Sequence, residues 1–224
     1  LHDVSQNEHV LRIRFLTGHP NYFTDRMIEA VRDLPKVMPH FELPVQAGND
    51  EVLENMNRGY TADEFRAVVK RVRDKMPEST INTDVIVGFP GETEAQFMDT
   101  YNLMKELRLD KIHLAKYSER PKTIAARKMP DDVTDEDKED RRLRLDALNN
   151  SILEEKNLPY VGQTTEVLVE SKQKDKWRGR DPFNRLVFFS SEQDLTGAIV
   201  RTSIHWAGPF SLQGELVEVV VPPL

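Results

Sequence analysis

The chain has 224 residues, enough for one large domain or two smaller ones with real hydrophobic cores. It contains no cysteine, which excludes disulfides and cysteine-ligated metal centres within this sequence. With 31 basic and 38 acidic residues the net charge is −7, so the overall charge does not by itself predict a nucleic-acid partner. No apolar run approaches the length of a membrane helix, and the start lacks a signal-peptide pattern. We therefore expect a cytoplasmic protein with no membrane partner; because residue 1 is Leu rather than Met, we expect a fragment.

Strand and helix patterns alternate through the first two-thirds of the sequence. Alternating or continuous apolar residues predict strands at 10–16, 41–45, 81–87 and 111–117. Helical spacing predicts helices at 24–34, 49–57, 61–76 and 93–107. Two of these helices begin with capping boxes, formed by Thr61 with Glu64 and by Thr93 with Gln96. Connections of this length favour parallel strands with helices packed outside. Four such strands do not close a barrel, so we predict an α/β fold that is an incomplete TIM-like barrel whose first units are missing.

The last third of the sequence has a different character. Residues 129–133 form a predicted linker, and Thr134 begins a charged helix that continues to about Asn157. From Tyr160 onward, short alternating strands separated by Gly, Asp and Pro predict a small all-β barrel. The predicted division is therefore an α/β part at 1–133, a linker helix at 134–159 and a β-barrel at 160–224.

Three loops follow predicted strands and carry residues suited to binding a ligand. The loop 46–50 offers the amide of Gln46, the turn residue Gly48, and Asn49 at the start of a helix. Helix starts present unpaired N–H groups that bind anions or hydroxyls, but an ordinary strand-to-helix turn with Asn49 as its cap explains the same residues. The second segment, 83–93, has Asp84 within the predicted strand and Gly88 after it, where the missing side chain lets a ligand approach the backbone. The third loop spans residues 117–126.

These three strings, together with Met56-Asn57-Arg58-Gly59-Tyr60-Thr61, resemble one family closely: the methylthiotransferases of the radical S-adenosylmethionine class. The resemblance extends from about Leu11 to Val217. The sequences of residues 43–46, 56–60 and 117–121 are most similar to the tRNA-modifying branch. The chain has Lys122 where the family usually has Gly. The resemblance implies that the incomplete barrel is part of a radical S-adenosylmethionine barrel.

The same resemblance implies cofactors and roles for individual residues. Such enzymes use S-adenosylmethionine, two 4Fe-4S clusters and a reductant for these clusters. The cysteines that ligate the clusters are absent from this chain, so we expect it to be inactive alone. For the S-adenosylmethionine pocket, the resemblance implies Gln46, Gly48, Asn49, Asp84 and Gly88. Glu119 and Arg120 are the catalytic candidates, which would orient the target base.

A basic segment in the last third suggests a nucleic-acid partner. Residues 172–185 carry six basic and two acidic side chains, and include Trp177 and Phe183. Basic side chains neutralise phosphates and aromatic rings stack on unpaired bases, although a solvated hairpin loop with a half-buried Trp explains the pattern about as well. The strings 177–180, 184–188 and 213–215 resemble a TRAM domain, a small RNA-binding β-barrel of this family. The candidate RNA contacts are Lys174, Lys176, Trp177, Arg178, Arg180 and Arg185.

Three functions remain open from the sequence. The resemblance favours the C-terminal part of an enzyme that adds a methylthio group to C2 of an N6-modified adenosine next to the tRNA anticodon, with the anticodon stem-loop as partner. The second possibility is the branch of the family that modifies a ribosomal protein. The third is a non-enzymatic RNA-binding protein that uses the TRAM-like barrel.

Overall fold

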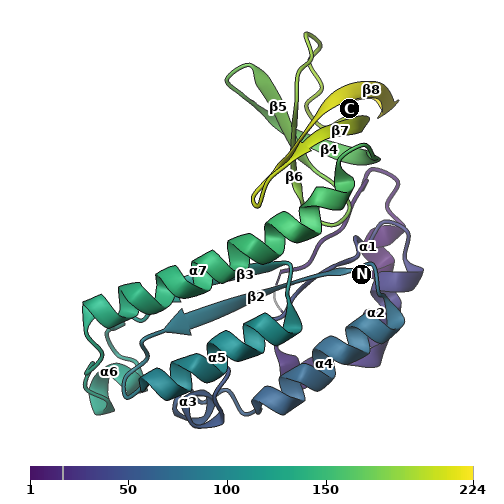
Figure 1. The fold of residues 1–224 in the computed structure, drawn as a ribbon. Helices are drawn as coiled ribbons and strands as arrows, with labels where there is room; N and C mark the ends of the chain where they lie inside the picture. Colours follow the sequence, from purple (N-terminus) through teal and green to yellow (C-terminus); the bar gives the residue numbers. More distant parts are fainter. Residues whose placement is uncertain (17, 224) are drawn as a thin grey trace. The chain divides into compact units, whose positions relative to one another are not determined.

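The computed structural model describes residues 1–16 and 18–223, which divide into two compact units at residues 149 and 150 (Figure 1). Within the described residues, no helix combines the length and apolar character needed to cross a membrane. The first unit is an α/β fold, as predicted. Its elements in chain order are α1 (His2–Ser5), η1 (Pro20–Tyr22), α2 (Asp25–Asp33), β1 (His40–Glu42), α3 (Asp50–Asn55), α4 (Ala62–Lys75), β2 (Thr80–Val87), α5 (Glu94–Leu107), β3 (Lys111–Lys116) and α6 (Ile124–Lys128). The long helix α7 (Asp135–Asn157) crosses the division between the units.

The strands of the first unit form a three-stranded parallel sheet in the order β1-β2-β3. The predicted strands at 41–45, 81–87 and 111–117 are confirmed, and so is their parallel arrangement. The predicted strand at 10–16 is wrong: among the described residues it makes only an isolated bridge between Ile13 and Val37. The backbone of Ile13 bonds to Lys36 and Met38 alone, and a strand needs a partner along its length.

The two faces of β2 have opposite chemistry. Ile81, Val85 and Val87 are almost fully buried in a core that also contains Phe41, Phe65 and Phe97. The alternate residues Asn82 and Asp84 project from the other face, since successive side chains of a strand point to opposite sides. Figure 1 shows α4 and α5 along one side of β2. The sheet therefore has one apolar face packed on helices and one polar face.

A buried ion pair holds the start of α5 against α7 within the first unit. Glu92 Oε2 accepts hydrogen bonds from the Gly88 N–H at 2.7 Å and from Arg141 Nη1 at 2.9 Å. Both side chains are buried, at 1% and 7% exposure. Arg141 also donates to the Glu92 carbonyl, and Asn149 on the same helix accepts the N–H of Ile112 at the edge strand β3. Both capping boxes, Thr61–Glu64 and Thr93–Gln96, are confirmed.

The second unit is a closed β-barrel with strand order β4-β5-β6-β8-β7. Its elements are η2 (Leu158–Tyr160), β4 (Thr164–Gln173), β5 (Lys176–Arg180), β6 (Leu186–Phe189), β7 (Ile199–Ala207) and β8 (Leu212–Val221). The small all-β barrel is therefore present as predicted. Strand β5 was not among the predicted strands, because Trp177 is its only large apolar residue and basic side chains flank it. Trp177, Val187, Phe189 and Leu212 belong to the core of this barrel.

Removing one partner of the buried ion pair should weaken the first unit specifically. Arg141→Ala leaves the buried Glu92 carboxylate without its cation, which typically costs about 3–5 kcal/mol. The control Arg142→Ala removes the neighbouring guanidinium, whose partner Glu139 is exposed, and should cost far less. Urea unfolding by circular dichroism measures both. Tryptophan fluorescence should not change in parallel, since both tryptophans lie in the second unit. Equal losses for the two variants would contradict this role of Arg141.

Candidate functional site

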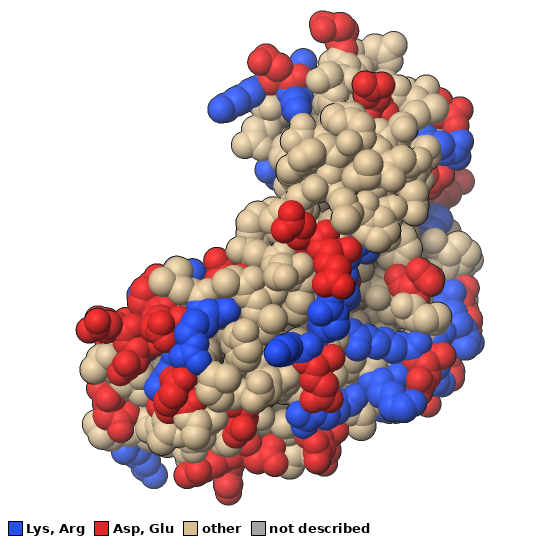
Figure 2. Space-filling model, in the orientation of Figure 1, with Lys and Arg blue, Asp and Glu red and all other residues tan. Residues whose placement is uncertain are grey.

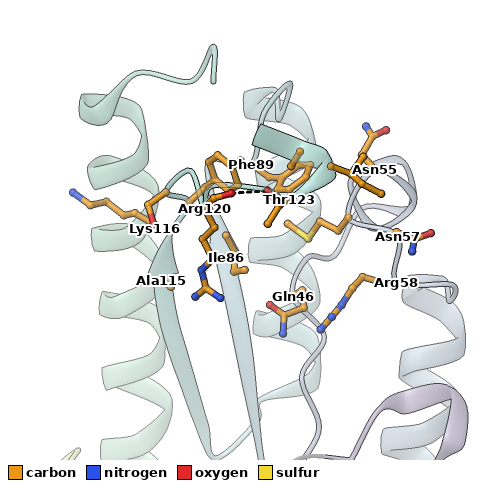
Figure 3. Close-up of a pocket in the computed structure, with 15 residues that line it drawn as sticks. Gln46, Asn55, Asn57, Arg58, Ile86, Phe89, Ala115, Lys116, Arg120 and Thr123 are labelled. Carbon is orange, nitrogen blue, oxygen red and sulfur yellow. Dashed lines mark hydrogen bonds between the residues drawn. The ribbon is translucent and has the colours of Figure 1, made fainter. Parts of the chain in front are cut away.

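A cavity of about 530 Å³ lies at the carboxyl ends of β2 and β3 (Figure 3). Ile86 and Ala115 contribute from the strands, and Gln46 from the segment after β1. Ligands of α/β proteins commonly bind at this edge of a parallel sheet. The other lining residues are Asn55, Met56, Asn57, Arg58, Phe89, Lys116, Tyr117, Ser118, Arg120, Thr123, Ile124 and Ala125.

One part of the cavity is rich in hydrogen-bond donors. Figure 3 shows the side chains of Arg58 and Arg120 reaching toward Gln46 from opposite sides. The Nε atom of Arg58 is buried and has no hydrogen-bond partner among the described residues. A buried donor without a partner is costly, and an oxyanion or carbonyl of a ligand would satisfy it. This part of the cavity therefore suits a carboxylate or phosphate.

The opposite wall is apolar and aromatic. Phe89 and Tyr117 meet edge to face, with ring centroids 5.2 Å apart. Met56, Ile86 and Ile124 complete this wall. Apolar walls with a few fixed polar groups are typical of sites for small molecules that contain an aromatic ring.

Asp84 lies on the polar face of β2, two residues before Ile86 along the strand. Burial raises the pKa of Asp84, and the nearby carboxylate of Glu42 raises it further, against the opposing charges of His113 and Arg58. Glu42 itself accepts hydrogen bonds from His40 and Asn82, both at 2.9 Å. Although burial opposes it, the pKa of Glu42 is lowered by these bonds and by the nearby His113. Of these two carboxylates, Asp84 has the greater capacity to accept a further donor, but it is not among the residues that line the cavity.

Three of the residues proposed for the cofactor have structural partners instead of lining the cavity. The Gly48 N–H donates to Thr100 on α5, and a Cβ at this position would lie 2.6 Å from the Thr100 Cα. Asn49 caps α3 and donates to Asp99. Gly88 has a φ of +71°, and a Cβ there would lie 2.2 Å from the side chain of Lys138. In this structure, these glycines admit neighbouring helices, where the sequence had suggested a ligand.

The loop after β3 places Arg120, but not Glu119, among the residues that line the cavity. The Arg120 carbonyl accepts hydrogen bonds from the Thr123 N–H and hydroxyl. Lys122 in this turn has a φ of +75°, a conformation usually reserved for glycine. Lys122 therefore adopts a backbone conformation that a Gly at this position would favour.

The barrel also redistributes the residues proposed for RNA. Trp177 is buried at 4% exposure and its Nε1 donates to the Ser191 carbonyl, so its ring has no face open for stacking on a base. The expectation that Trp177 stacks on RNA does not fit this fold, because alternation along β5 turns this residue inward. Arg185 contacts Asp181 and lies over the Tyr160 ring. Arg180 pairs with Glu170, whereas Lys174 and Lys176 are exposed.

Sequence reasoning missed Arg58 as a site residue and missed the polar face of the sheet. Arg58 lies within one of the segments that resemble the family. The sequence does not show, however, that its side chain points into the cavity. The polar face had a signal as well: His40, Glu42, Asn82 and Asp84 alternate with apolar residues in strands that are usually apolar throughout in parallel sheets. Among the described residues, no group of His, Asp or Glu side chains is arranged to hold a metal ion.

Comparison with known proteins shows which family part of this chain resembles. Residues 3–104 match the model of the radical SAM superfamily. This part of the chain is similar to radical SAM domains. The radical SAM part of the resemblance found in the sequence is thereby confirmed. A solved structure of coproporphyrinogen III oxidase from Escherichia coli, a radical SAM enzyme, matches 60% of this chain and 30% of its own, with 24% identity and a TM-score of 0.47.

Several curated proteins are similar over nearly the whole chain, and each is named tRNA-2-methylthio-N(6)-dimethylallyladenosine synthase. The relative from Roseiflexus sp. (strain RS-1) is 48% identical over 92% of this chain and 44% of its own length. The relative from Chloroflexus aurantiacus is 49% identical over 92% and 45%. The relative from Dehalococcoides mccartyi (strain CBDB1) is 43% identical over 98% and 52%. The chain thus spans about half the length of these relatives.

The raised pKa of Asp84 predicts how pH affects the first unit. Its contribution to stability is fully present below the ordinary carboxyl pKa near 4 and is lost as pH rises through the raised value. We therefore expect Asp84→Asn to stabilise the unit at pH 7 and to flatten its stability between pH 4 and 7. Urea unfolding by circular dichroism across this range tests it. A variant less stable than the parent at pH 7 would show instead that the ionised carboxylate is held by a favourable contact.

Proposed function

We propose that this chain is the C-terminal part of a tRNA methylthiotransferase. The enzyme would add a methylthio group to C2 of an N6-modified adenosine next to the anticodon. The observation that carries the proposal is the similarity over 92–98% of the chain to relatives named tRNA-2-methylthio-N(6)-dimethylallyladenosine synthase, together with a radical SAM domain. In this proposal, the chain contributes part of the S-adenosylmethionine pocket and a module that binds the anticodon stem-loop.

The cavity has groups that match S-adenosylmethionine, which when bound supplies a methyl group and an adenosyl group. Ile86 and Phe89 would pack on the adenine. The buried, unpaired Nε of Arg58 and the side chain of Arg120 would hold the carboxylate, since guanidinium groups bind carboxylates strongly. Asp84 would accept hydrogen bonds from hydroxyl or ammonium groups. Gln46 remains in the proposed pocket, whereas Gly48, Asn49 and Gly88 would support it by positioning α3, α5 and the loop after β2.

The iron–sulfur clusters of the proposed enzyme do not fit this chain. Cluster ligands are cysteine thiolates in the great majority of sites, and the sequence contains none. The proposed enzyme therefore needs cluster ligands from outside these 224 residues, and the chain alone should be inactive. A reductant would serve the clusters there.

The barrel of residues 160–224 is, in this proposal, a TRAM domain that binds tRNA. Between residues 171 and 180, five side chains are basic and one is acidic, and Lys174 and Lys176 are exposed. Exposed Lys and Arg side chains neutralise phosphates and supply much of the affinity for nucleic acids. Arg178, whose contact with Glu170 is long at 4.0 Å, would also bind phosphates. Arg180 and Arg185 would mainly stabilise the barrel through closer acidic partners. Glu119 remains the candidate for orienting the target base, since Arg120 is assigned in this proposal to the carboxylate of S-adenosylmethionine.

A chimeric enzyme tests the proposed reaction. This chain would be joined to the N-terminal half of the Roseiflexus relative and produced in a host whose tRNA lacks the 2-methylthio group. We expect mass spectrometry of digested tRNA to detect 2-methylthio adenosine. The modification on a ribosomal protein instead would assign the chain to the protein-modifying branch. A folded chimera that binds tRNA but modifies neither would favour a non-enzymatic RNA-binding protein.

The pocket assignment predicts the effect of removing its cations. Arg58→Ala in the chimera should weaken S-adenosylmethionine binding by about 10-fold or more, because a charged hydrogen bond contributes about 1.5–3 kcal/mol. Arg120→Ala should have a smaller effect of the same sign, since Arg120 is exposed. The matched control is Arg66→Ala, which removes an arginine paired with Glu106 outside the cavity. Isothermal titration calorimetry measures all three. An unchanged affinity for Arg58→Ala would remove this residue from the site.

A further inference from the structure

The second tryptophan of the chain, Trp206, lies on the outside of the barrel. The pairing of β7 with β8 shifts between Ile204 and Trp206, so that two residues of β7 face one residue of β8. Ile204 is buried in the barrel core, and strict alternation would send Trp206 inward as well. The bulge reverses this direction, and Trp206 is 46% exposed. Bulges that redirect one side chain are common beside functional sites.

Trp206 ends a row of side chains that crosses four strands of the barrel. Arg178 on β5 pairs with Phe188 on β6, and Phe188 pairs with Gln213 on β8. Gln213 in turn pairs with Trp206 on β7. The neighbours of these residues along the strands, such as Trp177, Val187 and Leu212, are buried in the core. The four residues, hereafter the outer row, therefore share the exterior face, where neighbouring strands lie about 4.8 Å apart.

The aromatic ring at the end of the outer row has a defined position. A Cβ at Gly208 would lie 2.4 Å from the Trp206 ring, so the ring lies against the bare backbone of Gly208. The carbonyl of Gly208 accepts a hydrogen bond from Asn157, and its N–H bonds to Ser211, which fixes this turn. One face of the Trp206 ring is thus supported while nearly half of the side chain remains exposed. A preordered ring loses little conformational entropy when a flat ligand stacks on it.

Polar groups of the outer row suit the edges and phosphates of nucleotides. Lys176 donates to the Gln213 side-chain oxygen at 2.7 Å, which leaves the Gln213 amide nitrogen as the donor pointing away from this bond. The Nε of Arg178 is buried without a hydrogen-bond partner among the described residues. Lys174 and Lys176 extend the positive charge along the β4–β5 hairpin, and basic side chains gather at that side of the barrel in Figure 2. Phe188 and Trp206 are separated by two strand spacings, about 10 Å, with Gln213 between them.

We propose that the outer row is a surface on which unpaired RNA bases stack, with Trp206 as its main platform. This inference rests on the proposed RNA-binding role of the barrel and names the face and the kind of RNA. The combination of aromatic rings, an amide and adjacent cations matches single-stranded RNA, whose bases stack on rings and whose phosphates bind Lys and Arg. Paired bases present no free face, so the surface should distinguish a loop from a duplex. Trp177, the tryptophan that the sequence favoured, has only the role of a core residue here.

The test is RNA binding by the whole 224-residue chain. The probes are a stem-loop with an unpaired adenosine-rich loop and a fully paired duplex of the same length, each titrated at several salt concentrations. We expect Trp206→Ala to weaken stem-loop binding about tenfold or more, as for a lost base–aromatic stack, and to leave duplex binding unchanged. Its salt dependence should not change, because no charge is removed. Gly208→Ala, which displaces the ring without deleting it, should act in the same direction.

Three further variants separate stacking from charge and from folding. Trp206→Phe keeps an aromatic ring and should retain binding, but it should abolish the quenching of tryptophan fluorescence by RNA, because Trp177 alone remains and is buried. Lys174→Ala/Lys176→Ala should instead reduce the salt dependence for both probes. Val219→Ala, an exposed change on β8 outside the outer row, is the control.

The outcomes distinguish the two proposals. If the parent chain binds the stem-loop and Trp206→Ala binds it equally well, the stacking surface is overturned while the RNA-binding role stands. If the folded parent chain binds neither RNA, both are overturned. If Trp206→Ala weakens duplex and stem-loop binding alike, recognition of unpaired bases is overturned.

Discussion

The buried carboxylate of Glu92 is the contact on which the pocket of the first unit depends. It accepts the Gly88 N–H and the Arg141 guanidinium, and thereby joins the end of β2, the start of α5 and the helix α7. Phe89, in the loop so fixed, forms the apolar wall of the cavity with Tyr117. Burial raises the pKa of Glu92, and the hydrogen bonds from Gly88 and Arg141 oppose this rise. The contact therefore stabilises the loop only as a complete set, since a lone buried charge would destabilise it.

The polar face of the sheet likewise depends on which of its charged groups have partners. Glu42 has its hydrogen bonds satisfied by His40 and Asn82, which leaves Asp84 as the carboxylate with capacity for a further donor. Arg58 supplies a nearby cation whose Nε is buried without a partner among the described residues. A site with an unmatched acceptor and an unmatched donor is suited to a ligand that carries both charges, as an amino-acid group does. In the proposed pocket, structural stability and ligand binding would therefore compete for these few groups.

The barrel shows how one irregularity in strand pairing can redirect a side chain. Strict alternation buries Trp177 along β5, and the bulge in β7 exposes Trp206. In the sequence, Trp177 among basic residues suggested contact with RNA. Trp206, between His205 and Ala207, has no such neighbours. The basic residues on either side of Trp177 correctly indicated the solvent-facing positions of β5. They gave no information on the direction of the Trp177 side chain. The bulge depends on the pairing with β8, which lies outside the local sequence.

The sequence by itself determined the periodicity of most elements, both capping boxes, the parallel arrangement of the predicted strands and the radical SAM relationship. The periodicity and the capping boxes follow from the spacing of neighbouring residues, whereas the radical SAM relationship rests on the resemblance of whole segments to a known family. Only the tertiary structure decided that residues 10–16 pair through a single bridge, that Gly48 and Gly88 admit Thr100 and Lys138, and that Arg58 and Arg120 converge on one cavity. Each of these depends on which segments, distant in sequence, come into contact. Local propensity does not contain that information, because packing of the whole unit selects the partners.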